Sequence, residues 1–127
     1  MGANVYIVAR NKEKAEEAVK EIKSASGNKN VKYFLANLSS QKSIRQLAAE
    51  IKNEMNVVDV LINNAGGGYG NNYVENDLQE NWVNSYMVNV VAPMYLSKSV
   101  IPNMRNNKFG HIFFITSLIV DRPQPGL

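Results

Sequence analysis

The chain has 127 residues, of which 45% are apolar and 20% are charged. This size and composition fit one small globular domain and exclude a disordered chain and a collagen-like repeat. Because cysteine is absent and histidine occurs once, disulfides, thiol nucleophiles, histidine-based metal sites and Ser-His triads are excluded too. The net charge of +3 is spread along the chain, whereas nucleic-acid binders concentrate their charge.

No stretch of the sequence has the roughly 20 consecutive apolar residues of a membrane span. The apolar run near the N-terminus is also too short for the core of a secretory signal peptide. Together with the lack of cysteine, these features predict a soluble, cytoplasmic protein that binds neither membranes nor nucleic acids.

Four apolar runs have the length of strands and are rich in Val, Ile, Phe and Tyr. They cover residues 5–9, 31–36, 57–62 and 111–116. Three of them show little alternation of apolar and polar residues, which is typical of parallel strands covered on both faces. The run at 31–36 is more mixed. We therefore expect four strands of a parallel sheet.

Two amphipathic helices lie between the first three runs. Asn11 can cap the first helix and Gly27 can end it, and its apolar positions recur at helical spacing: Ala15, Ala18, Val19 and Ile22. Either Ser39 or Ser40 can cap the second helix. Its apolar face consists of Ile44, Leu47, Ala48, Ile51 and Met55.

A longer helical segment begins near Leu78 and ends near Met104, and its apolar residues surround most of the helix. A helix of this kind is buried on two sides. We expect one side to pack on the sheet and the other on a second subunit, which predicts a homo-oligomer. Pro93 should kink or interrupt the helix.

Strands and helices alternate in the order βαβαβαβ, which predicts a doubly wound α/β domain with a parallel sheet and right-handed crossovers. In such a fold, ligands bind at the carboxyl ends of the strands. Candidate ligand-binding residues therefore follow each of the four runs, and they are Ala9-Arg10-Asn11, Asn37-Leu38, Asn63-Asn64-Ala65-Gly66 and Thr116-Ser117.

Three segments carry a resemblance to a known family. They are Asn63-Asn64-Ala65-Gly66, Val88-Asn89-Val90 and residues 110–117 (Gly-His-Ile-Phe-Phe-Ile-Thr-Ser). In this order and at this spacing they resemble the short-chain dehydrogenase/reductase family over essentially the whole chain. The resemblance implies that residues 1–127 form a partial, Rossmann-type NAD(P)-binding domain that runs from the family's second strand to just past its fifth.

Two features of the family lie outside this sequence. The glycine-rich Thr-Gly-x-x-x-Gly-x-Gly turn would precede Met1, and the Tyr-x-x-x-Lys pair would begin after Leu127. The chain is therefore expected to be an internal piece of a dehydrogenase. Because the family's strand order is 3-2-1-4-5, we also expect a gap one strand wide between two pairs of strands.

The end of the first run bears on the choice of cofactor. An acidic residue there would bind the ribose of NAD, whereas an arginine nearby accommodates the 2′-phosphate of NADP. By the same resemblance, Ala9 occupies the position where family members that prefer NAD have Asp, and Arg10 follows it. NADP(H) is therefore favoured over NAD(H). The alternative interpretation is a solvated Arg10 beside a helix start.

The resemblance implies that Asn37 and Leu38 hold the adenine of the cofactor, although the family usually has Asp in place of Asn37. The Asn37 side-chain carbonyl could accept a hydrogen bond from the adenine amino group. Equally, Asn37 could cap the helix that follows. By the same resemblance, Asn64, Ala65 and Gly66 line the cofactor and Asn63 ties the sheet together; the alternative is a plain turn.

Asn89 and Ser117 are the candidate catalytic residues. Because Asn89 is surrounded by valines, we expect its side chain to be buried and hydrogen bonded, bracing an irregularity of the helix. The resemblance implies that Asn89 also holds a water of a proton relay. It implies that Ser117 holds the substrate oxygen, on which charge develops during hydride transfer. The alternative for Ser117 is a helix cap.

These observations predict an oxidoreductase that transfers a hydride between NADP(H) and a small carbonyl or alcohol substrate, similar to the 3-oxoacyl-carrier-protein reductase branch of the family. No metal is expected to take part. A non-catalytic nucleotide-binding or scaffold protein could use the same fold, so this alternative stays open.

Overall fold

The computed structural model describes residues 2–69 and 76–117. It has four strands: β1 (Val5–Ala9), β2 (Val31–Leu35), β3 (Val60–Asn63) and β4 (His111–Phe114). The helices are α1 (Lys12–Ser26), α2 (Gln41–Glu54), α3 (Gln79–Tyr86), the single π-turn η2 (Met87–Val91) and α4 (Ala92–Asn106). The predicted alternation of strands and helices is confirmed.

One strand begins later than its apolar run predicts. Residues 57–59 were expected to belong to the third strand, yet β3 begins only at Val60, which pairs with His111 at the start of β4. Before His111 the chain turns back, since the Phe109 N–H donates to the Met104 carbonyl at 3.1 Å. The pairing with β4 starts only at the Asp59 carbonyl, which accepts from the His111 N–H at 2.9 Å, and residues 57–59 form the connection from α2.

The helix ends follow the capping residues of the sequence. The Asn11 side chain accepts a hydrogen bond from the Lys14 N–H at 2.8 Å at the start of α1. Gly27 ends α1 in the left-handed conformation, with φ of 68°, which costs glycine little because it has no Cβ. Ser40 caps α2 by accepting from the Ser43 N–H.

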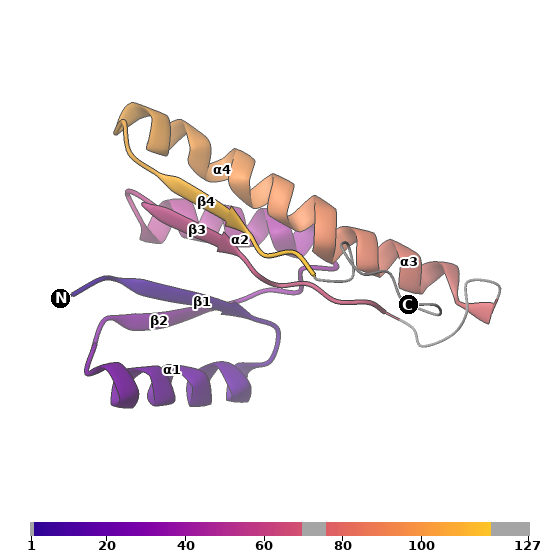
Figure 1. Ribbon diagram of the computed structural model, residues 1–127, viewed down its shortest axis with the longest axis horizontal. Helices are drawn as coiled ribbons and strands as arrows, with labels where there is room; N and C mark the ends of the chain where they lie inside the picture. The colour runs from indigo at the N-terminus through magenta and orange to yellow at the C-terminus, as the bar shows by residue number, and fades with distance from the viewer. Residues whose placement is uncertain (1, 70–75, 118–127) are drawn as a thin grey trace.

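The strands form two separate parallel pairs, β1 with β2 and β3 with β4. Figure 1 shows β1 and β3 as the facing strands of the two pairs, with no strand between them in the part of the chain that the structure describes. The expected gap between two pairs of strands is therefore confirmed.

The backbone of β1 is hydrogen bonded on one side only. The Ala9 carbonyl accepts from the Ala36 N–H at 2.9 Å, on the side of β2. Because backbone groups alternate between the two sides of a parallel strand, those of Tyr6 and Val8 point to the other edge. No described residue hydrogen bonds to them there.

The same holds for β3. The Asn63 carbonyl accepts from the Ile115 N–H at 2.9 Å on the side of β4, so the backbone groups of Val60 and Ile62 point to the opposite edge. Within the described ranges these groups also lack a backbone partner. The two edges without partners are thus those of β1 and β3.

Helices lie on both faces of the strands. In Figure 1, α1 lies on one side and α2 and α4 lie on the other. The main apolar cluster lies between α2, α4 and the strands, and its buried members are Ala36, Leu47, Ala48, Ile51 and Leu96. The face of β3 and β4 that carries Ile62 and Phe113 is exposed, Ile62 to 60%. The expectation of strands covered on both faces is therefore wrong for this pair within the described residues.

The long predicted helix is divided into α3, η2 and α4. Pro93 is the second residue of α4, and the π-turn η2 ends two residues before it, so the predicted interruption near Pro93 is confirmed. One side of α4 is buried, including Leu96 and Val100. Apolar side chains elsewhere along this segment are exposed, namely Tyr86 (61%) at the end of α3 and Met94 (62%) in α4. None of the described helices is long and apolar enough to cross a membrane.

Candidate functional site

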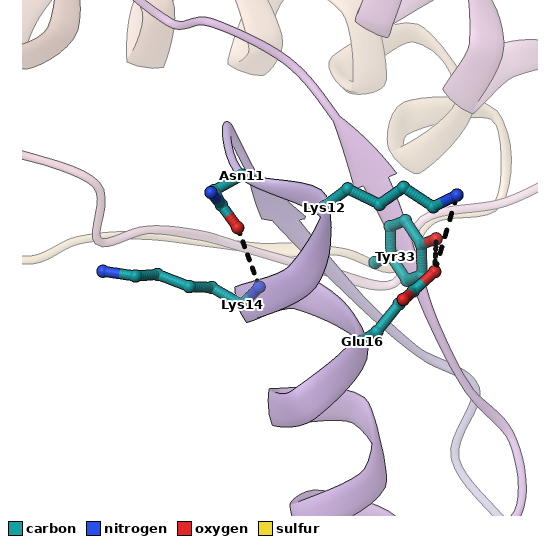
Figure 2. Close-up of polar contacts among 5 residues, drawn as sticks. All are labelled: Asn11, Lys12, Lys14, Glu16 and Tyr33. Carbon is teal, nitrogen blue, oxygen red and sulfur yellow. Dashed lines mark hydrogen bonds and ion pairs between the residues drawn. The ribbon is translucent and has the colours of Figure 1, made fainter.

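The first part of the candidate site is the turn from β1 into α1, where three basic side chains gather. Lys12 forms an ion pair with Glu16 at 3.8 Å. The Tyr33 hydroxyl donates to the same Glu16 oxygen at 3.1 Å (Figure 2). This hydrogen bond to Glu16, together with partial desolvation, raises the pKa of Tyr33 above its ordinary value. The ion pair with Glu16 thus already occupies the Lys12 charge.

Arg10 and Lys14 are the two other cations of this turn. Arg10 is exposed directly after β1, and Figure 2 shows the Lys14 side chain extending away from Glu16. Neither forms an ion pair with any described residue. The turn therefore offers two uncommitted cations, and sequence reasoning identified only Arg10.

The end of β2 lies beside the end of β1, because the hydrogen bond from Ala36 to Ala9 extends the pairing past the last strand residue. Asn37 and Leu38 follow at once, so the structure brings them to the same edge as Arg10. Leu38 is half-buried and packs against the main apolar cluster.

Asn37 does not cap α2, so this interpretation is wrong: Ser40 is the cap. The Asn37 side-chain oxygen accepts from the Ser39 N–H at 3.0 Å and from the Ser39 hydroxyl at 2.8 Å. The Asn37 N–H donates to the Ser43 hydroxyl at 2.9 Å. The spacing Asn-x-Ser is typical of such a turn, and this signal could have identified Ser39 from the sequence.

The loop after β3 contains the predicted cofactor-lining residues Asn64, Ala65 and Gly66, all of which are exposed. A Cβ atom on Gly66 would lie 2.9 Å from the Asn89 side-chain oxygen. This close approach excludes a larger residue unless Asn89 shifts, which is the reason for glycine here. Asn63 donates to the buried Ser97 hydroxyl at 3.4 Å and so ties β3 to α4.

Asn89 connects this loop to the π-turn. Its side-chain oxygen accepts from the Gly67 N–H at 3.0 Å, and its side-chain nitrogen donates to the Gly67 carbonyl at 2.8 Å. The expected helix irregularity at Asn89 is confirmed, because Asn89 lies within η2, and its side chain connects this turn to the loop at Gly67. The expectation that it is buried is wrong: Asn89 is exposed and its hydrogen-bond partner is loop backbone.

The π-turn also releases main-chain carbonyls. The Ala92 N–H bonds to the Met87 carbonyl, five residues back, so the Val88 carbonyl loses its α-helical donor. Its next possible donor would be Pro93, which has no N–H. Pro93 also deprives the Asn89 carbonyl of its α-helical donor. Two helix carbonyls beside the loop thus lack an ordinary α-helical partner.

Ser117 is exposed and lies two residues beyond Ile115, whose N–H bonds to the Asn63 carbonyl. The structure thus places Ser117 at the same end of the β3–β4 pair as Asn64. The residues after Ser117 lie outside the described ranges, so the alternative of a helix cap is not tested. All the predicted site residues lie at the carboxyl ends of strands or on η2 beside them.

Comparisons with known proteins agree with this geometry. The family model for short chain dehydrogenases matches residues 1–127. The 3-oxoacyl-acyl-carrier-protein reductase of Haemophilus influenzae is 30% identical over 112 residues, which cover 88% of this chain and 46% of the reductase.

Two solved structures have the same fold. A metagenomic short-chain oxidoreductase in complex with NADP matches with a TM-score of 0.82 and 32% identity over 92% of this chain and 51% of that protein. An NAD+-bound xylitol dehydrogenase matches with a TM-score of 0.80 and 18% identity over 95% of this chain and 46% of that protein. The chain thus spans about half the length of the proteins it matches. By its sequence and its fold, this chain belongs to the short-chain dehydrogenase family.

Proposed function

We propose that this chain is part of an NADP(H)-dependent oxidoreductase that acts on a small carbonyl or alcohol substrate. The observation that carries the proposal is the clustering of the site residues at the carboxyl ends of the strands. Pairing at Ala9–Ala36 and at Asn63–Ile115 aligns the ends within each pair. Dinucleotides bind at this edge of open α/β sheets, and a similar fold holds NADP in the metagenomic oxidoreductase.

The residues present fit such a cofactor. Arg10, with Lys14 nearby, offers positive charge for a 2′-phosphate, and a guanidinium matches phosphate geometry well. An acidic residue that would repel this phosphate is absent at Ala9 and Arg10. The small residues Ala65 and Gly66 permit close approach of a ribose to the backbone, since Gly66 has no side chain to obstruct it. These features favour NADP(H) over NAD(H).

When bound, the nicotinamide supplies or accepts the hydride. We assign Ser117 to donate a hydrogen bond to the substrate oxygen, because a placed donor stabilises the charge that develops there. Each polar atom of the Asn89 side chain forms one hydrogen bond to Gly67. We assign the Val88 and Asn89 carbonyls, which lack an α-helical donor at the π-turn, as further acceptors for a water of the proton relay.

The test uses the completed enzyme, in which this chain carries the flanking segments that its relatives have. We expect it to oxidise NADPH with a panel of aldehydes, ketones and 3-oxoacyl thioesters, and to use NADH less well. Binding of NADPH with no turnover of any of these substrates would instead favour the non-catalytic nucleotide-binding or scaffold alternative.

We also propose that the enzyme is a cytoplasmic homo-oligomer. Four exposed apolar residues follow one another at intervals of four along α3, η2 and α4, namely Trp82, Tyr86, Val90 and Met94. Such a stripe fits the same stripe of a second copy. Light scattering of the completed enzyme should show an oligomer, and Tyr86→Glu should yield monomers; cell fractionation tests the location.

A further inference from the structure

The hydrogen bonds of Asn37 determine which groups it can offer to the base of a cofactor. The backbone N–H of Asn37 donates to Ser43, and its backbone carbonyl accepts from the Ser40 N–H at 3.1 Å. Its side-chain oxygen accepts twice from Ser39. The side-chain NH2 is the one polar group of Asn37 without a partner among the described residues.

The orientation of this amide follows from chemistry. The Ser39 backbone N–H can only donate, so the Asn37 atom that it meets must be the oxygen. The Ser39 hydroxyl then occupies the second lone pair of the same oxygen. Because an amide oxygen has two lone pairs, Asn37 has no acceptor left for a ligand and offers two donors instead.

In this orientation the Asn37 NH2 group would face the 6-amino group of adenine, if the base lies where the family resemblance implies. The 6-amino group of adenine is a donor, whereas the 6-oxo group of hypoxanthine is an acceptor. A donor at Asn37 meets the amino group without forming a hydrogen bond, but it can bond the oxo group. The expectation that the Asn37 carbonyl accepts from adenine is therefore not supported by the hydrogen bonds of this turn.

We propose that Ser39 is a positioning residue that turns the Asn37 amide so that the base pocket does not select adenine over a 6-oxo purine. The inference rests on the proposed function, because it requires the dinucleotide base to lie at Asn37. It goes beyond that function in naming which base edge the site accepts and which residue determines this.

The test compares two dinucleotides on the completed enzyme by fluorescence titration: NADPH and its reduced hypoxanthine analogue. We expect their dissociation constants to agree within about threefold. A larger ratio would correspond to the free energy of a full hydrogen bond to one of the two bases. Asn37→Asp should favour NADPH by a further factor of about three to ten, because a carboxylate has acceptors for both Ser39 and the amino group. Asn30→Asp, which makes the same charge change at the other end of β2, should leave the ratio unchanged.

Ser39 is tested by its own pair of variants. Ser39→Ala removes one of the two donors to Asn37 and should move the ratio part of the way toward NADPH, whereas Ser39→Thr keeps the hydroxyl and should keep the native ratio. A native enzyme that binds NADPH more than about tenfold tighter than the analogue, or an unchanged ratio in Asn37→Asp, would overturn the inference alone. Failure to bind either dinucleotide would overturn the proposed function and the inference with it.

Discussion

The two pairs of strands differ in what surrounds them. The β1–β2 pair is joined to α1 and to α2 by side-chain contacts, such as Tyr33 with Glu16 and Lys32 with Glu54. The β3–β4 pair packs on one face only, and its other face exposes Ile62 and Phe113. Both pairs have the same topology, parallel strands with a helical crossover. Their difference therefore lies in the layers around them rather than in the strands.

The two pairs also differ in the chemistry at their carboxyl ends. The first ends in Arg10 and Asn37, which suit binding of the phosphate and base of a dinucleotide. The second ends in Asn64, a proposed cofactor-lining residue, and in Ser117, which with Asn89 on the neighbouring π-turn is proposed to serve the reacting end. Under the proposed function, the residue that selects NADP(H) and the residues that act on the substrate lie on separate strand pairs, whose facing edges both lack backbone partners among the described residues.

The largest effect is expected from a change in the second pair. Ser117→Ala in the completed enzyme should lower kcat about 100-fold or more, because one placed donor to the substrate oxygen is lost. The dissociation constant of NADPH should stay nearly the same, since cofactor selection belongs to the first pair. Steady-state kinetics and NADPH titration measure the two quantities, and wild-type turnover would show that Ser117 acts as a helix cap.

A change in the first pair of strands should alter the cofactor preference instead. Ala9→Asp with Arg10→Ala should shift the preference from NADPH toward NADH by roughly tenfold to 100-fold, because a hydrogen-bonding cation is exchanged for a ribose acceptor. Titration of both cofactors measures this shift. Lys12→Ala is the matched control: Lys12 pairs with Glu16, so this variant should leave the preference unchanged. Equal relative affinities in the double variant and the parent would refute the assignment of Arg10.

Gly66 and Asn89 test the connection within the second pair. Gly66→Ala places a Cβ 2.9 Å from the Asn89 oxygen and should destabilise the completed enzyme by about 1–3 kcal/mol, through the loss of hydrogen bonds to Gly67. Gly68→Ala, which meets nothing within 4 Å, is the control. Thermal unfolding measures both. In an Asn89→Ala background the cost of Gly66→Ala should largely vanish, and a persistent cost would contradict the proposed contact.

The smallest effect is expected at the surface of the first pair. Glu16→Gln should lower the pKa of Tyr33, because the hydrogen bond to Glu16 raises it. Since the folded-state pKa lies above the unfolded one, the stability from this contact is present at neutral pH and is lost as the pH rises through the Tyr33 pKa. NMR titration of Tyr33 measures the shift, and an identical titration curve in the variant would contradict the contact.

The strands, the Asn11 cap and a serine cap at Ser39 or Ser40 could be predicted from the sequence, because apolar periodicity and capping chemistry are local properties, whereas the gap was implied by the family resemblance. The exposed position of Asn89 could not, since its valine neighbours indicate a buried side chain and only the fold brings the Gly67 backbone beside it. The Asn37 contact with Ser39 could have been predicted from the Asn-x-Ser spacing, whereas the hydrogen bond of the Asn37 N–H to Ser43 depends on how α2 is placed. Residues 57–59 look like a strand, but their pairing with β4 is limited to the hydrogen bond of the Asp59 carbonyl, so β3 begins at Val60.

The central claim of the proposed function is that Arg10, which selects NADP(H), and Ser117, which binds the substrate oxygen, lie on two strand pairs whose facing edges need a strand between them. Buried backbone groups without partners cost about 1–3 kcal/mol each, which is large against a domain stability of about 5–15 kcal/mol. The most direct measurement is a fluorescence titration with NADPH and a thermal melt of the 127-residue chain beside the completed enzyme. We predict weak NADPH binding, no cooperative melt and a tendency to aggregate for the chain alone, and tight binding for the completed enzyme. Micromolar NADPH binding and a cooperative melt by the 127-residue chain alone would contradict the claim.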